Sequence, residues 1–290
     1  MSIFFGLLCF VFSNEVFRLM ELLSFFAPGV DENGKSHRYA FYDDHIIVTY
    51  SSDKTYLRLC YLNGPSKGGM LSKNVIPFDN FRVDIRFSLI KPEEKSYGNG
   101  IAFWVTKENE FISGDCYGRN EKFSGCLVVL DTSPVSKTAG VSSPYIGVAC
   151  GNELNYDVSS KGANIIKSPV QLKPTIFNSK CILRIENIDN NLKVSLSYKD
   201  NGFQEIYKIS NSGITKDCKF GISAMNSFNN FEYRIIGIRT YSAEKIAKTH
   251  TTGEQHEPKK GSRYVWLIFA VVIVAIGYYL YRKGERLNKD

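Results

Sequence analysis

The strongest constraint on the fold is a strict alternation of apolar and polar side chains. From Phe81 to Leu89 every odd position is apolar and every even position is polar. Successive side chains of a strand point to opposite faces, so this pattern predicts a strand with one buried face. Residues 192–199 repeat the pattern between two clusters of Asp, Asn and Gly that favour tight turns. Residues 181–209 are therefore predicted to form a three-stranded antiparallel meander.

Two continuous apolar runs predict strands that are covered on both faces. They span residues 101–105 and 126–130, and each is short enough to be a strand. Further strands are predicted at 144–150, 219–225 and 231–241. Because no long amphipathic helix and no internal repeat accompanies them, the expected architecture is an all-β antiparallel β-sandwich.

Both ends of the chain carry apolar segments that do not suit a soluble core. Residues 3–13 have the length of the apolar part of a signal peptide, so residues 1–13 are predicted to be a signal peptide cleaved near Ser13. The alternative is a buried N-terminal strand. Residues 264–281 carry no charge and would cover about 27 Å as a helix. They predict one C-terminal transmembrane helix, and its short length favours an early secretory membrane.

These segments divide the chain into five parts. Residues 14–241 are predicted to be the lumenal domain, 242–263 a stalk rich in Lys, Thr, Glu, Gly and His, and 282–290 a cytosolic tail. Basic residues flank both ends of the predicted span, so the signal peptide, and not the positive-inside rule, sets the expected type I orientation. The net charge of +7 is spread along the chain, which argues against a nucleic-acid partner.

The cysteines indicate an oxidising compartment. Of the 7 cysteines, all but Cys9 lie outside the predicted signal peptide: Cys60, Cys116, Cys126, Cys150, Cys181 and Cys218. An even number in a secretory protein predicts disulfides, although the sequence does not choose among the possible pairings. No CxxC motif occurs, and few histidines precede the stalk, so a zinc site is not expected.

Several motifs, in order, resemble those of the leguminous-type (L-type) lectins. The first is Gly98-Asn99-Gly100 followed by the apolar strand with Trp104, and the second is the apolar strand that ends in Asp131-Thr132. Gly68-Gly69-Met70-Leu71, Leu154-Asn155-Tyr156-Asp157 and Phe220-Gly221-Ile222-Ser223-Ala224 continue the likeness over residues 22–241. The resemblance implies a concanavalin-like jelly roll and a role as a cargo receptor between the endoplasmic reticulum and the Golgi.

In that family a calcium ion fixes the groups that bind mannose-rich glycans. By the resemblance, Asp131 is the first calcium ligand, Ser133 supplies a backbone carbonyl, and Asn99 takes the place of a sugar-binding acid. Two other expected ligands are changed, because Val135 replaces an asparagine and Lys161 replaces an aspartate. The expected site is therefore degenerate, with Asn99 and Asp131 as carbohydrate-binding candidates, no bound metal or other cofactor, and an Asp131–Lys161 ion pair in place of the ion.

Three functions compete at this point. The first is a membrane lectin that binds glycoprotein cargo in the lumen, and the second is a protein-interaction module that uses the same fold without binding sugar. The third is a glycosidase, which needs two acidic side chains about 5 Å apart or more. The strand-borne acidic cluster of such enzymes is not found, since Asp84 has no acidic neighbour two residues away. The chain is therefore not expected to be an enzyme.

Overall fold

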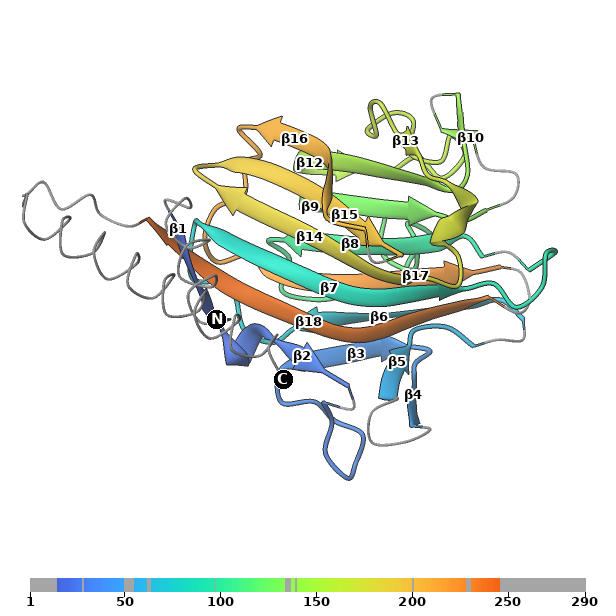
Figure 1. Cartoon of the computed structure of the whole chain (residues 1–290), viewed down its shortest axis with the longest axis horizontal. Coiled ribbons are helices and arrows are strands. Elements are labelled where there is room, and N and C mark those ends of the chain that lie inside the picture. The colour runs from blue at the N-terminus through green and yellow to red at the C-terminus, as the bar shows by residue number, and fades with distance from the viewer. Residues whose placement is uncertain are drawn as a thin grey trace, which may run out of the picture. The chain divides into compact units, whose positions relative to one another are not determined.

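The computed structural model describes residues 15–245, except residues 28, 50–54, 62–63, 97, 134–136, 139, 200 and 228–230. Two large antiparallel sheets and one separate two-stranded pair form this part of the chain (Figure 1). Two 3-10 helices, Glu21–Leu23 and Pro174–Ile176, lie in the connections. The predicted all-β antiparallel class is confirmed.

The larger sheet has nine strands. Seven follow the order β16-β15-β14-β7-β18-β5-β4, while β1 and β2 also pair with β18. Their bounds are β1 Glu15–Leu19, β2 Phe25–Phe26, β4 Ile46–Thr49, β5 Thr55–Arg58, β7 Phe81–Ile90, β14 Lys180–Ile188, β15 Asn191–Tyr198, β16 Gln204–Ser210 and β18 Glu232–Lys245. The predicted meander is present as β14, β15 and β16.

The smaller sheet has seven strands in the order β13-β12-β9-β8-β17-β6-β3. Their bounds are β3 Tyr39–Asp43, β6 Ser66–Ser72, β8 Gly100–Thr106, β9 Lys122–Asp131, β12 Tyr145–Asn155, β13 Val170–Gln171 and β17 Lys219–Asn226. Strands β10 (Lys137–Thr138) and β11 (Val141–Ser142) form a separate pair.

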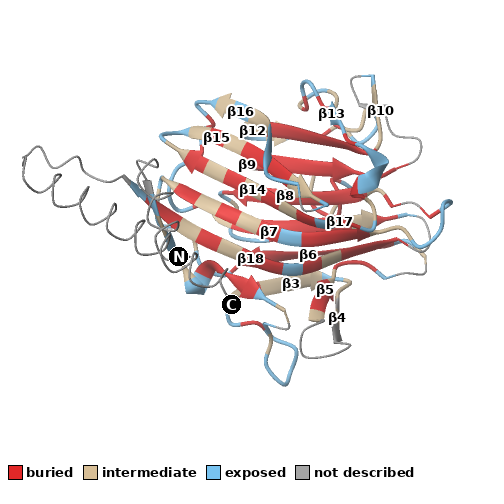
Figure 2. Cartoon of the chain, in the orientation of Figure 1, coloured by how far each residue is buried: buried red, intermediate tan, exposed pale blue. Residues whose placement is uncertain are grey.

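The main core lies between the two sheets. On β7 the apolar residues from Phe81 to Leu89 are fully buried, whereas Arg86 on the opposite face is exposed, as the alternation predicts. Strand β8 is buried along its whole length (Figure 2). Phe103 faces the main core, and Trp104 faces a second apolar cluster formed with the loops that cover the smaller sheet. The continuous apolar run therefore reflects burial on both faces.

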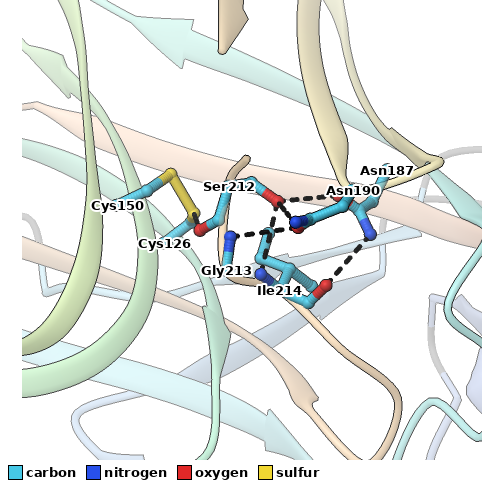
Figure 3. The surroundings of a disulfide bond; sticks show 7 residues. All are labelled: Cys126, Cys150, Asn187, Asn190, Ser212, Gly213 and Ile214. Carbon is cyan, nitrogen blue, oxygen red and sulfur yellow. Dashed lines mark hydrogen bonds between the residues drawn. A yellow bond between two sulfur atoms is a disulfide. The ribbon is translucent and has the colours of Figure 1, made fainter. Parts of the chain in front are cut away.

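The cysteines differ from the expectation. Cys126 on β9 and Cys150 on β12 are opposite each other in the strand register and form a disulfide. Figure 3 shows this bond beside Ser212, whose side chain donates a hydrogen bond to Asn187. The other cysteines of the domain, Cys60, Cys116, Cys181 and Cys218, are buried free thiols. The prediction of disulfides is therefore confirmed for Cys126 and Cys150 alone, while the other four cysteines pack as small apolar side chains in the core.

Both terminal segments fall outside the described residues. The predicted signal peptide at 1–13, most of the stalk and the predicted span at 264–281 are among them. Within residues 15–245, as far as they are described, no helix is long and apolar enough to cross a bilayer.

Candidate functional site

Asp131 ends strand β9 at the margin of the smaller sheet and is only 2% exposed. One carboxylate oxygen accepts a hydrogen bond of 2.9 Å from the Tyr117 hydroxyl, and the other accepts one of 2.9 Å from the backbone N–H of Ser133. Ser143 donates to the backbone carbonyl of Asp131 at 2.9 Å. Burial, and next the negative charge of Asp131, raise the pKa of Tyr117 well above its ordinary value, so this phenol remains a donor.

Asp131 lines a small pocket that also brings together two other predicted site residues. Asn99 and Lys161 line it, and so do Asp115, Tyr117, Tyr156, Val158 and Met225. The enclosed volume is about 10 Å³, which is close to the minimum that holds one water molecule. Within this lining the Tyr117 hydroxyl is bonded to the Asp131 carboxylate.

Asn99 lies between this pocket and the loop that follows β17. Its backbone N–H donates to the carbonyl of Met225 at 3.1 Å, and its side-chain oxygen accepts from the backbone N–H of Ser227 at 2.6 Å. The backbone carbonyl of Asn99 also accepts from Thr132 at 3.1 Å. The residue therefore fixes three strand ends relative to one another, and it is half-buried.

Lys161 lies in a compact loop after β12. The loop is closed by its own hydrogen bonds, such as Gly162 N–H to the carbonyl of Asp157 at 2.8 Å, and Ser159 caps the Asp157 carboxylate. Lys161 lines the same pocket as Asp131, whose carboxylate oxygens accept hydrogen bonds from Tyr117 and Ser133. The ion pair between Asp131 and Lys161 stays a prediction.

The pocket does not match what calcium requires. Calcium takes about six to eight oxygen ligands at 2.3–2.6 Å, whereas Val158 and Met225 offer no side-chain oxygen and Lys161 brings a positive charge. The oxygens of Asp131 already have donors, and Asp115 lies 4.0 Å from the ammonium of Lys67. Within the described residues no group of three or more His, Cys, Asp or Glu side chains could hold a metal. Val135 lies outside those residues.

A larger pocket adjoins the small one at Met225. It encloses about 340 Å³ and is lined by Asp44, Pro65, Ser66, Lys67, Met225, Asn226 and Ser227. This volume is within the range of small-molecule sites. The Asp44 carboxylate can accept hydrogen bonds, and the ammonium of Lys67 and the hydroxyl of Ser66 can donate them. Such an arrangement suits a neutral ligand rich in hydroxyl groups.

Sequence reasoning missed Tyr117 and the residues of the larger pocket. Two glycines give a signal for its position: Gly100, which packs against the Tyr117 ring, and Gly118, which follows Tyr117 in sequence. A Cβ at Gly100 would lie 2.6 Å from the Tyr117 ring, and one at Gly118 would lie 2.6 Å from the Ala224 carbonyl, so both positions need glycine. Gly100 was part of the recognised motif, but the motif does not say which ring it accommodates.

Comparisons with known proteins agree with this architecture. The VIP36 exoplasmic/lumenal domain, solved bound to Ca²⁺ and Man3GlcNAc, has a TM-score of 0.67 and 21% identity, covering 78% of this chain and 90% of that one. The legume lectin-like domain from Entamoeba histolytica (TM-score 0.59, 18% identity, 77% and 98% covered) and the Emp47p carbohydrate recognition domain (0.60, 13%, 78% and 97%) share the fold. A comparison with curated protein sequences finds no match. The model of the legume-like lectin family matches residues 21–250, and the chain belongs to that family.

Proposed function

We propose that the chain is a single-pass type I membrane lectin of the early secretory pathway that binds glycoprotein cargo in the lumen of the endoplasmic reticulum or Golgi without calcium. The polar pocket of about 340 Å³ beside Asn99 carries this proposal, because it offers hydroxyl, ammonium and carboxylate groups to a sugar at the strand ends of a lectin fold. Membership of a lectin family favours binding over catalysis. The predicted span at 264–281 supports the membrane anchor.

In this arrangement Asn99 and Asp131 have different roles. Asp131 is buried and bonded to Tyr117, so it holds the strand end in place and does not reach the ligand. Asn99 is half-buried and binds the loop at Ser227, which lines the larger pocket. Asn99 therefore positions the sugar-binding loop, while Lys67 and Asp44 make the direct contacts.

The test is a glycan array with the full chain in detergent, in chelator and in calcium. We expect binding of mannose-rich glycans that does not depend on calcium and that falls at least about tenfold in Lys67→Ala, since a hydrogen bond to a charged group contributes about 1.5–3 kcal/mol. Lys173→Ala, an exposed lysine after β13, is the matched control. Binding that requires calcium, or that survives Lys67→Ala, would contradict the proposed site.

A second candidate, a protein-interaction module without sugar binding, is favoured by one observation. The Asp131 pocket, where the family resemblance places sugar recognition, has room for little more than one water molecule. Under this alternative no glycan on the array binds, while lumenal proteins still co-purify with the chain. A separate experiment tests the membrane topology. Protease added to intact microsomes should remove only the tail at 282–290.

A further inference from the structure

The outer face of the larger sheet carries a third pocket, separate from the two at the margin of the smaller sheet. It encloses about 170 Å³ and is lined by Phe26, Ala27, Thr55, Arg86, Ile236, Gly237 and Arg239. These residues come from β2, β5, β7 and β18 and the turn after β2. None of them belongs to the lectin motifs.

The strand register explains why the pocket exists. Gly237 on β18 is opposite Arg86 on β7 and also opposite Phe26 on β2, so the three form one row across the sheet. Residues opposite one another share a face. The middle member of the row has no side chain, which leaves a depression between a guanidinium and a phenyl ring.

A β-bulge widens the depression. The register of β18 against β7 shifts between Ile235 and Gly237, so Ile236 is an extra residue, and it is 37% exposed. Arg239 follows Gly237 by two residues on the same face, and its guanidinium lies 5.6 Å from the centroid of the Phe26 ring. Two arginines and two apolar side chains therefore surround the glycine.

The positive charge in this pocket has no acidic partner within the described part of the chain. Neither Arg86 nor Arg239 lies within 4.0 Å of a carboxylate there. Asp84 is opposite Arg239 in the register, but Arg184 binds both of its oxygens, at 2.8 and 2.9 Å. The acid opposite Arg239 is thus already engaged by another arginine.

The apolar wall of the pocket, formed by Phe26 and Ile236, indicates which kind of anionic ligand fits best. Phe26 is 43% exposed and Ile236 is 37% exposed. Both line the pocket together with the two arginines. A phosphate or sulfate ion alone would use the guanidinium groups and leave this wall in water. A carboxylate side chain next to an apolar side chain uses both, because guanidinium groups bind carboxylates through paired hydrogen bonds and burial of the apolar neighbour adds to the affinity.

We propose that this pocket binds an acidic, partly apolar peptide segment of a partner protein, through a carboxylate held by Arg86 and Arg239 and an apolar side chain packed on Phe26 and Ile236. The pocket lies on the outer face of the larger sheet, whereas the candidate sugar pocket lies at strand ends of the smaller sheet. Binding of peptide and binding of glycan should therefore be independent. If one of them is not detected, the proposal for the other pocket is not contradicted.

The probe is a fluorescein-labelled hexapeptide of alternating glutamate and phenylalanine, titrated against the full chain in detergent and followed by fluorescence anisotropy. We expect saturable binding that weakens as salt is raised. Arg86→Gln with Arg239→Gln should weaken it at least about tenfold, consistent with the loss of charge-assisted hydrogen bonds. The matched control removes two exposed positive charges elsewhere, Lys173→Gln with Lys208→Gln, and should leave the affinity within about twofold.

Each alternative has its own outcome. A peptide with glutamine in place of glutamate should not bind, and equal binding of it would overturn the role of the carboxylate. Displacement of the peptide by inorganic phosphate at the same molar concentration would assign the pocket to phosphate and contradict a peptide ligand. Unchanged affinity in the double arginine variant, or no binding to the unmodified chain, would refute the proposal. The single variant Arg86→Gln, at an exposed position, provides the same comparison if the double variant does not fold.

Discussion

The hydrogen bond from Tyr117 to Asp131 is the contact that most distinguishes this site from a metal site. A buried carboxylate is costly unless donors satisfy it, and here a phenol and a backbone N–H do so at 2.9 Å each. Both side chains are nearly inaccessible, with Tyr117 at 4% and Asp131 at 2% exposure. The phenol therefore helps to offset the cost of burying the carboxylate.

The first prediction follows from that contact. Tyr117→Phe keeps the ring but removes the donor, so the free energy of unfolding should fall by about 1–3 kcal/mol. Urea denaturation measures it. Asp131→Asn in the same background should recover part of the loss, since the amide has no charge to satisfy. Equal losses in the single and double variants would show that the two groups are not coupled.

The second prediction concerns the effect of buried thiols on the free energy of unfolding at alkaline pH. Burial raises the pKa of Cys60 and of Cys181 from 9.0 to about 12. The unfolded chain then loses these protons near pH 9 while the folded chain keeps them, so stability is constant below pH 9 and falls as pH rises towards 12. Each thiol contributes a slope of up to about 1.4 kcal/mol per pH unit.

Urea denaturation between pH 7 and pH 11 measures this slope. Cys60→Ala with Cys181→Ala should give a shallower decline above pH 9, whatever its effect at pH 7. The disulfide variant Cys126→Ala with Cys150→Ala is the control, because a disulfide does not titrate in the unmodified protein. An unchanged slope in the Cys60 and Cys181 variant would mean that these thiols ionise normally in the fold.

The sequence predicted part of the site. Asn99, Asp131 and Lys161 do line one pocket, because Asn99 and Asp131 lie at strand ends that meet at one margin of the smaller sheet and Lys161 lies in the loop after β12. Tyr117 could not be predicted, since it lies in the irregular segment after β8 where no periodicity applies. Its position depends on close approaches at Gly100 and Gly118 that only the folded chain reveals.

At the scale of strands, the prediction of strand positions succeeded where the pattern of side chains reflects which faces of the strand are buried. The alternation in β7 and the apolar run in β8 both follow from which faces are covered, so they were readable without a structure. Cysteine pairing was not readable, because it depends on strand order. Cys126 and Cys150 are 24 residues apart in sequence, yet β9 and β12 are neighbours that place them opposite each other.

The third prediction tests that pairing by alkylation and mass spectrometry. In native conditions none of Cys60, Cys116, Cys181 and Cys218 should react, because all are buried. In denaturant without reductant these four should be labelled, and Cys126 and Cys150 should react only after reduction. Labelling of Cys126 before reduction would contradict the disulfide. If the other four cysteines were not labelled in denaturant, they too would be disulfide-bonded.

At the scale of the whole domain, the two sheets carry different kinds of pocket. The margin of the smaller sheet carries the Asp131 pocket and the polar pocket beside it, where the fold's ligand chemistry is concentrated. The outer face of the larger sheet carries charged rows, one of which is interrupted by Gly237. Since the oxygens of Asp131 accept hydrogen bonds from Tyr117 and Ser133, we infer that the domain keeps its structure and its binding surfaces when calcium is removed.

The last prediction tests that inference on the full chain. Addition of chelator or of millimolar calcium should leave the melting temperature unchanged, because the oxygens of Asp131 are bonded to Tyr117 and Ser133. A ligand at 100 times its Kd adds about 2.7 kcal/mol, and about 1 kcal/mol shifts the melting temperature of a domain of this size by 2–4 °C. Calcium binding would therefore raise it by several degrees. The VIP36 lumenal domain, solved both with Ca²⁺ and metal-free, is the positive control. A calcium-dependent rise in this chain that disappears in Asp131→Asn would place a metal at this pocket after all, and would show that Tyr117 moves to admit it.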